Sequence, residues 1–175
     1  MQPPTQYSEW SVCLEELERG GNDETTLTAM AAGTLNWGAG VAPLFAERIC
    51  RLFDVRLKRC IDSINRDLKS AREEALFLRI LLDARRAFTF LSNVAVLPSF
   101  PENLRDQLSI LVRKSAEVAQ KSLEDSSKHD RSGRLGSLIR NNSLLNYNAN
   151  GNAASNQSLP NPRSNDGTRR RNILQ

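Results

Sequence analysis

Few residues in this 175-residue chain could carry out catalysis. The single histidine, His129, lies in a polar stretch, so a Ser-His-Asp or Cys-His site has no well-placed base. Zinc sites ordinarily need closely spaced pairs of ligands, and Cys13, Cys50 and Cys60 form no CxxC pair. The GxxxxGKS/T and GxGxxG patterns of nucleotide-binding loops are also missing from the sequence. We therefore predict a non-enzymatic protein that uses no metal or cofactor.

The cysteine count and the first residues predict a cytoplasmic location. An odd number of cysteines favours thiols that pack as small apolar side chains in a reducing compartment. The first ten residues, MQPPTQYSEW, contain neither the positive nor the apolar region of a secretory signal.

Six basic side chains form the most distinctive pattern, the basic face. At about 100° per residue they fall on one side of a predicted helix over residues 44–69, opposite its apolar side. Such a face suits phosphate backbones, anionic membrane surfaces or an acidic groove of another protein. The six are Arg48, Arg51, Lys58, Arg59, Arg66 and Lys69.

The basic face also has a simpler interpretation as a solvated helix surface, which we prefer. An acid placed four residues before a base stabilises a helix by about 0.2–0.5 kcal/mol. Three such pairs are present, namely Glu47–Arg51, Asp54–Lys58 and Asp62–Arg66.

The helix that carries this face lies in a longer stretch, residues 44–97, that contains neither glycine nor proline. Apolar side chains between positions 49 and 68 recur within one arc of about 120°. The sequence from Ser70 to Glu73 fits the S-x-x-E capping box, which satisfies free backbone N–H groups at a helix start. We predict a turn near residues 69–70. The alternative is one continuous helix of about 50 residues, about 75 Å long.

Residues 72–96 are apolar around most of the helix circumference, as in a central helix or an oligomer interface. They predict a homo-oligomer whose candidate interface residues are Leu76, Ile80, Phe88 and Leu91. Pro98 and Pro101 end this helix, because proline lacks a backbone N–H. A second capping box, from Ser99 to Glu102, begins a third long helix.

The first 40 residues are acidic, with six acids and one base. Residues 8–19 form a predicted short helix closed by Gly20-Gly21. It either packs on the bundle through Trp10 and Leu14 or covers the basic face and inhibits binding. Residues 25–46 carry no charge, and glycines among them favour a buried helix and loop over a membrane span. We predict that the loop containing Trp37 is mobile or faces a partner.

Residues 129–175 carry two acids and seven bases and are rich in asparagine and serine. Such a composition does not offset an ordering entropy of about 1–2 kcal/mol per residue, so we predict disorder. Two parts of this tail are candidate binding motifs: an apolar one that would fold as a helix in a partner's groove, and an arginine triplet for nucleic acid. Their residues are Leu135, Leu138, Ile139, Leu144 and Leu145, and Arg169, Arg170 and Arg171.

Together these features predict an all-α fold: a helical bundle of three to four amphipathic helices with a disordered basic C-terminal tail. The predicted parts are an acidic lead-in (residues 1–22), the bundle (23–128) and the tail (129–175). The preferred function is protein–protein interaction, as an adaptor, regulatory or assembly protein. The alternative is a nucleic-acid-binding regulatory protein that uses the basic face and the tail arginines. Membrane association is the least favoured function.

Overall fold

The computed structural model describes residues 1–20 and 23–146, and every regular element in these ranges is an α-helix. The all-α prediction is confirmed, but the described residues form six helices rather than three to four. The two that raise the number are short: α2 has no apolar stripe, and α6 has only 8 residues. The helices are α1 (Tyr7–Arg19), α2 (Asp23–Ala32), α3 (Ala42–Leu68), α4 (Glu74–Ala95), α5 (Glu102–Ser127) and α6 (Arg134–Asn141).

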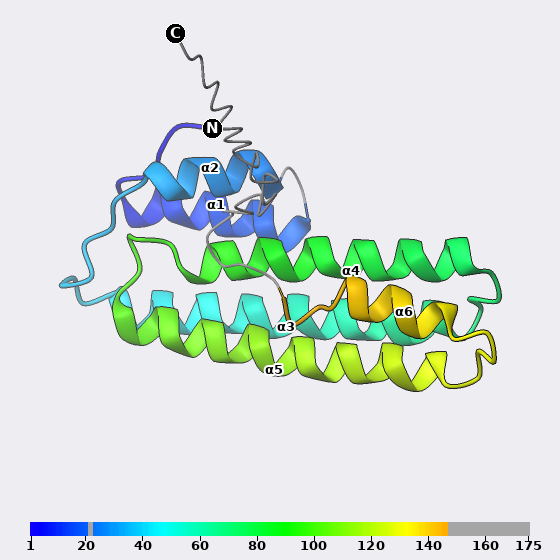
Figure 1. Ribbon diagram of the computed structural model, residues 1–175. Coiled ribbons are helices and arrows are strands. Elements are labelled where there is room, and N and C mark those ends of the chain that lie inside the picture. Colours follow the sequence, from blue (N-terminus) through cyan, green and yellow to red (C-terminus); the bar gives the residue numbers. More distant parts are fainter. Residues whose placement is uncertain (21–22, 147–175) are drawn as a thin grey trace, which may run out of the picture.

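The three long helices α3, α4 and α5 lie side by side as a bundle (Figure 1). The predicted turn near residues 69–70 is confirmed, since α3 ends at Leu68 and α4 begins at Glu74. The capping box predicted there is wrong. Ser70 continues the last turn of α3, where its hydroxyl donates to the Asp67 carbonyl at 3.0 Å, and Glu73 takes the N-cap position of α4. Ser70 is therefore too early in the chain to cap α4.

The second predicted capping box is also wrong. Pro101 occupies the N-cap position of α5, and the hydroxyl of Ser99 is buried without a hydrogen-bond partner. The Ser99 carbonyl instead accepts a hydrogen bond from the indole N–H of Trp37. Trp37 also packs edge-on against Phe100, with ring centroids 6.0 Å apart. Trp37 thus links its loop to the α4–α5 connection, and mobility of this loop or its contact with a partner stays a prediction.

The core lies between α3, α4 and α5 and includes most of the candidate interface residues. Phe88 and Leu91 are almost fully buried, and Ile80 retains 8% exposure. Only Leu76 remains at the surface, at 38% exposure. The three buried residues pack within one chain against neighbouring helices, and an oligomer interface on α4 stays a prediction.

Helices α1 and α2 cover one end of the bundle (Figure 1), where α1 packs on α3 and α2 packs on α4. Helix α1 buries four side chains: Trp10, Cys13, Leu14 and Leu17. It ends at Gly20, whose φ of 73° is a left-handed conformation that favours glycine. The packing of α1 through Trp10 and Leu14 is thereby confirmed.

The uncharged stretch of residues 25–46 forms most of α2, a connecting loop and the start of α3. Thr26, Ala29 and Met30 of α2 are buried, as predicted for a buried helix, whereas no residue of the loop 33–41 is buried, which corrects the prediction for the loop. Among the described residues, no helix combines the length and apolar character needed to cross a membrane.

The segment after α5 is folded as far as residue 146, which corrects the predicted disorder from residue 129. Helix α6 packs on α4 and α5, with Ile139 1% exposed and Leu144 fully buried. The backbone N–H of Leu144 donates to the buried Gln120 side-chain oxygen at 2.9 Å. The packing of this segment depends on two aliphatic side chains and one buried hydrogen bond. Two aliphatic residues form no periodic pattern in the sequence, so the polar composition alone predicted disorder. Residues 147–175, including Arg169, Arg170 and Arg171, lie outside the described residues.

The start of α6 should be sensitive to acid. Backbone and side-chain hydrogen bonds from Leu135 and Ser132 hold the pKa of Asp130 below its usual value. Because the pKa is lowered in the folded state, this stabilisation is complete above the ordinary aspartate pKa of about 3.9 and is lost as the pH falls through the folded pKa. We expect the Leu135 amide resonance to move toward its unfolded position below about pH 4. Asp130→Ala should show that displacement already at pH 7, whereas Asp106→Ala, on an exposed position of α5, should leave the wild-type titration unchanged.

Candidate functional site

A groove of about 570 Å³ runs between α3 and α4, and we call it the α3–α4 groove. Residues at the C-terminal end of α1 close one end, and the groove extends to the α3–α4 turn at Ser70. Its apolar lining comes from side chains on the three helices, all buried or partly buried except Leu76, which is exposed. These are Leu17, Cys60, Ile64, Leu76, Ile80, Ala84, Ala87 and Leu91.

Charged side chains of both signs stand beside this apolar lining. Arg59 and Asp67 come from α3, and Arg79 and Asp83 come from α4. The Arg79 and Asp83 side chains form an exposed ion pair with an N–O separation of 3.8 Å. An apolar floor between charged walls can accept the apolar face of an amphipathic helix.

Cys60 lines the same groove but is not a nucleophile at neutral pH. Burial raises the pKa of its thiol to about 11. Burial also raises the pKa of the Cys13 and Cys50 thiols. Since the thiolate is the reactive form, the three thiols act here as apolar packing groups.

A second depression, the arginine pocket, brings together three of the predicted binding residues. Arg48, Arg51 and Arg59 line it with the carboxylate of Glu18 and with Arg56. Its volume is about 430 Å³, and Leu52 and Val55 supply its apolar part. The basic face is therefore divided: these three arginines gather beside α1, while Lys58, Arg66 and Lys69 lie elsewhere on α3.

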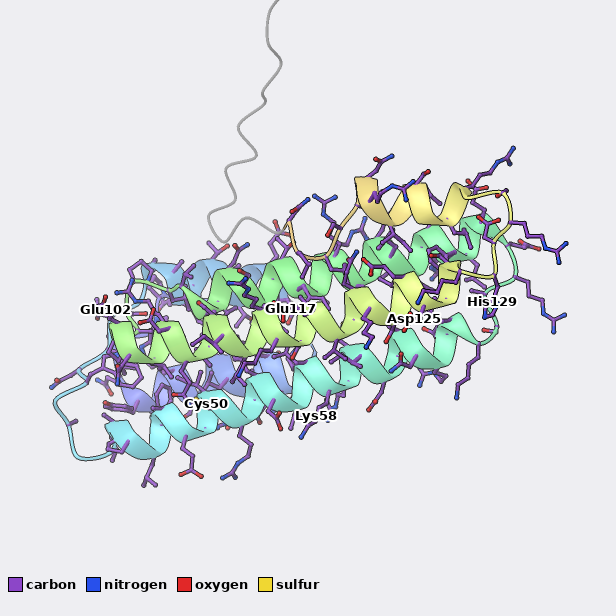
Figure 2. The ribbon with its side chains drawn as sticks, turned by 60° about the horizontal axis from the view of Figure 1, so that its bottom comes forward. Cys50, Lys58, Glu102, Glu117, Asp125 and His129 are labelled. Atoms are coloured by element: carbon purple, nitrogen blue, oxygen red, sulfur yellow. The ribbon has the colours of Figure 1, made fainter. Side chains whose placement is uncertain are left out.

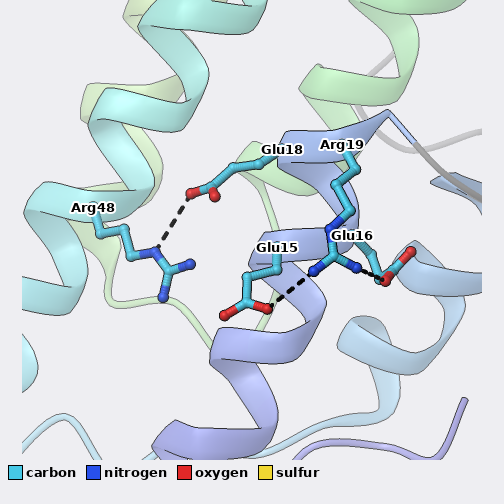
Figure 3. A network of polar contacts seen from close by, with 5 residues as sticks. All are labelled: Glu15, Glu16, Glu18, Arg19 and Arg48. Carbon is cyan, nitrogen blue, oxygen red and sulfur yellow. Dashed lines mark hydrogen bonds and ion pairs between the residues drawn. The ribbon is translucent and has the colours of Figure 1, made fainter.

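Only one carboxylate of α1 reaches the basic face (Figure 3). The Glu18 carboxylate lies 3.4 Å from Nε of Arg48. Glu15 and Glu16 instead bind Arg19 on their own helix, at 3.5 and 3.0 Å. From the sequence, α1 was considered as a segment that covers the basic face and inhibits binding. In the structure this contact is a single ion pair beside the arginine pocket.

The local ion pairs expected on α3 form in two cases out of three. Glu47 binds Arg51 and Asp54 binds Lys58, each at 2.8 Å, and Lys58 extends away from the bundle (Figure 2). The hydrogen bond that Lys58 donates to Asp54 also raises the pKa of Lys58. Arg66 binds the adjacent Asp67 at 3.3 Å instead of Asp62, so the third expected pair is wrong.

The best-connected arginine, Arg56, was missed by sequence analysis. Its guanidinium donates to both carboxylate oxygens of Asp23, at 3.0 and 2.8 Å, and to the Leu17 carbonyl at 3.1 Å. Its Cζ atom also lies 5.2 Å from the centre of the Phe90 ring. Arg56 therefore joins α1, α2 and α4 to α3. Its main partner is 33 residues away in the chain, so no local spacing could indicate the pair.

Arg56→Ala should lower the free energy of unfolding by about 1–3 kcal/mol, because it removes charge-assisted hydrogen bonds from a largely buried site. Urea unfolding followed by circular dichroism measures this change. Arg51→Ala is the matched control on the same helix. Its ion pair is 73% and 63% exposed, so we expect a loss below about 0.5 kcal/mol. Equal losses in the two variants would contradict the assigned role of Arg56.

The described residues show no constellation for metal binding: no three histidine, cysteine, aspartate or glutamate side chains gather as ligands there. His129 is exposed beyond the end of α5 (Figure 2). The described residues form an all-α bundle with several surface depressions, among them the α3–α4 groove and the arginine pocket. Comparison with protein-family models, curated proteins and solved structures gave no match to this chain. Function is therefore inferred from the groove and the pocket.

Proposed function

We propose that this protein is a non-enzymatic adaptor, regulatory or assembly protein that binds an amphipathic helix of a partner in the α3–α4 groove. The observation that carries this proposal is the uneven covering of the bundle. Helix α6 covers α4 and α5, and α1 covers part of α3, while the described helices leave the groove from Leu17 to Ser70 open.

The dimensions and lining of the groove support a short helix as its ligand. The groove follows α3 from Arg56 to Ser70, and a helix of about ten to fourteen residues spans about 15–21 Å. Such a helix would place apolar side chains at positions i, i+3, i+4 and i+7 against Cys60, Leu76 and Ile80. Arg59 and Asp83 would pair with charges on its flanks.

Peptides selected from a displayed library of helical sequences test this function. Their affinity for the full-length protein is measured by fluorescence anisotropy. Leu76→Asp places a charge in the groove at a 38% exposed position, and we expect affinity to fall about tenfold or more. Ile110→Asp makes the same kind of change at a 52% exposed position on α5 and should leave affinity unchanged. Selected peptides that bind both variants equally would refute the groove as the binding site.

The alternative function, nucleic-acid binding, is favoured by the gathering of Arg48, Arg51 and Arg59 in one pocket. It is weakened by the acidic partners of Arg51, Lys58 and Arg66. The two functions differ in salt dependence, because phosphate contacts release counterions and weaken steeply as salt rises. Burial of an apolar helix face is nearly independent of salt.

Self-association and a cytoplasmic location stay predictions. The homo-oligomer was inferred from the apolar circumference of α4, and Phe88 and Leu91 are used within the single chain. Self-association is therefore no longer supported by that face.

A further inference from the structure

We propose that the arginine pocket binds the phosphate group of a phosphorylated side chain on the partner whose helix occupies the α3–α4 groove. This inference rests on the proposed function and adds a chemical requirement to it. Three steps support it: the hydrogen-bonding capacity of the arginines, the charge balance of the pocket, and its continuity with the groove.

The arginines of the pocket have N–H donors that are not used by the described acidic residues. Arg59 has no acidic partner among the described residues. Arg48 meets Glu18 only through Nε, so the described acids leave its two terminal nitrogens unused. Arg51 is 73% exposed and uses one terminal nitrogen for Glu47. A guanidinium presents five N–H donors in a planar fork that matches phosphate oxygens, and the three arginines line one pocket.

The local charge also attracts a phosphate monoester. Arg48, Arg51 and Arg59 contribute three positive charges, Glu18 contributes one negative charge, and Glu47, the partner of Arg51, contributes a second. Arg56 is balanced by Asp23, to which it is hydrogen-bonded twice. The remaining charge is positive, and a phosphorylated side chain carries a charge of about −1.5 to −2 at pH 7. Leu52 and Val55 supply the apolar part of the pocket.

The pocket adjoins the groove, because Glu18, Arg56 and Arg59 line both. One partner segment can therefore place its helix in the groove and its phosphate in the pocket. A nucleic-acid strand would instead need free cations in a continuous row. Beyond Arg59, Arg66 is bound to Asp67, and Lys69 comes after the end of α3 and does not line the pocket. The geometry favours a phosphopeptide over nucleic acid.

Phenyl phosphate titrated into the full-length protein tests the pocket directly. NMR spectra of the arginine Nε–H groups follow the titration at constant ionic strength, with sodium sulfate as the reference anion. We expect saturable shifts for Arg48 and Arg59. Arg59→Gln should weaken binding about tenfold or more, because it removes a charged donor group. Glu18→Gln should tighten binding, because it removes the competing carboxylate.

Lys69→Gln is the matched control. It removes a cation directly after α3 that has no acidic partner among the described residues, and it should leave affinity unchanged. Equal effects of the Lys69 and Arg59 substitutions, or weakening by Glu18→Gln, would overturn the pocket assignment. Stronger binding of a single-stranded oligonucleotide with a steep salt dependence would overturn it in favour of nucleic acid.

The phosphate titration does not involve the apolar lining of the groove. Phosphate binding without helix binding would therefore refute the proposed function alone, and helix binding without phosphate binding would refute the pocket alone.

Discussion

Trp10→Ala should lower the free energy of unfolding by about 3–5 kcal/mol, the range for truncating a large aromatic residue in a core. The Trp10 side chain is fully buried and packs on Phe100, with ring centroids 5.9 Å apart. Its indole N–H donates to the Thr34 carbonyl at 2.8 Å. The substitution therefore leaves a cavity and also deprives a part-buried carbonyl of its partner.

Urea unfolding followed by far-ultraviolet circular dichroism measures this loss. Val12→Ala lies two residues away on α1 at a 52% exposed position, and we expect it to change stability by less than about 0.5 kcal/mol. A loss below about 1 kcal/mol for Trp10→Ala would contradict the structure. It would mean that α1 separates from the bundle before the rest unfolds.

Leu144→Ala should lower the free energy of unfolding by about 2–5 kcal/mol. Leu144 is fully buried after α6, and its backbone N–H donates to the Gln120 side chain. The Gln120 amide nitrogen in turn donates to Glu124 at 2.8 Å. Burial of the Leu144 side chain therefore keeps its backbone N–H in place as the partner of the Gln120 oxygen, while the Gln120–Glu124 bond lies within α5.

Leu145 provides a control of identical chemistry at the next position. It is 47% exposed, so Leu145→Ala should cost less than about 0.5 kcal/mol. Thermal unfolding of the two variants beside the wild type measures the difference. If both substitutions were neutral, the segment after residue 128 would not pack on the bundle, and the disorder predicted from composition would be correct there.

The long helices were predictable because their apolar side chains recur over many turns. The pattern from Ile49 to Leu68 places α3, and the prolines at 98 and 101 mark the α4–α5 connection. The residues at which each helix starts and ends were harder to predict. Both capping boxes were expected from spacing alone, yet whether a serine caps a helix depends on where the preceding turn ends.

The contacts that position the site were mostly beyond sequence analysis, because they join distant parts of the chain. Glu47–Arg51 could be predicted, since both residues lie on one helix face four positions apart. Glu18–Arg48 and Asp23–Arg56 depend on how α1 and α2 lie on α3, 30 and 33 positions away. The basic face was identified, but which of its arginines gather in a pocket was not.

The sequence contains two tryptophans, Trp10 and Trp37, and both contact the ring of Phe100. Intrinsic fluorescence is therefore a probe of one end of this protein. It is insensitive to events around α6 and the α3–α4 turn, whereas circular dichroism reports on all helices together. Comparing the unfolding curves from fluorescence and from circular dichroism therefore compares the unfolding of this end with the unfolding of all helices. Coincident curves would establish a single cooperative transition, and an earlier fluorescence transition would identify the end that contains α1 as the first to open.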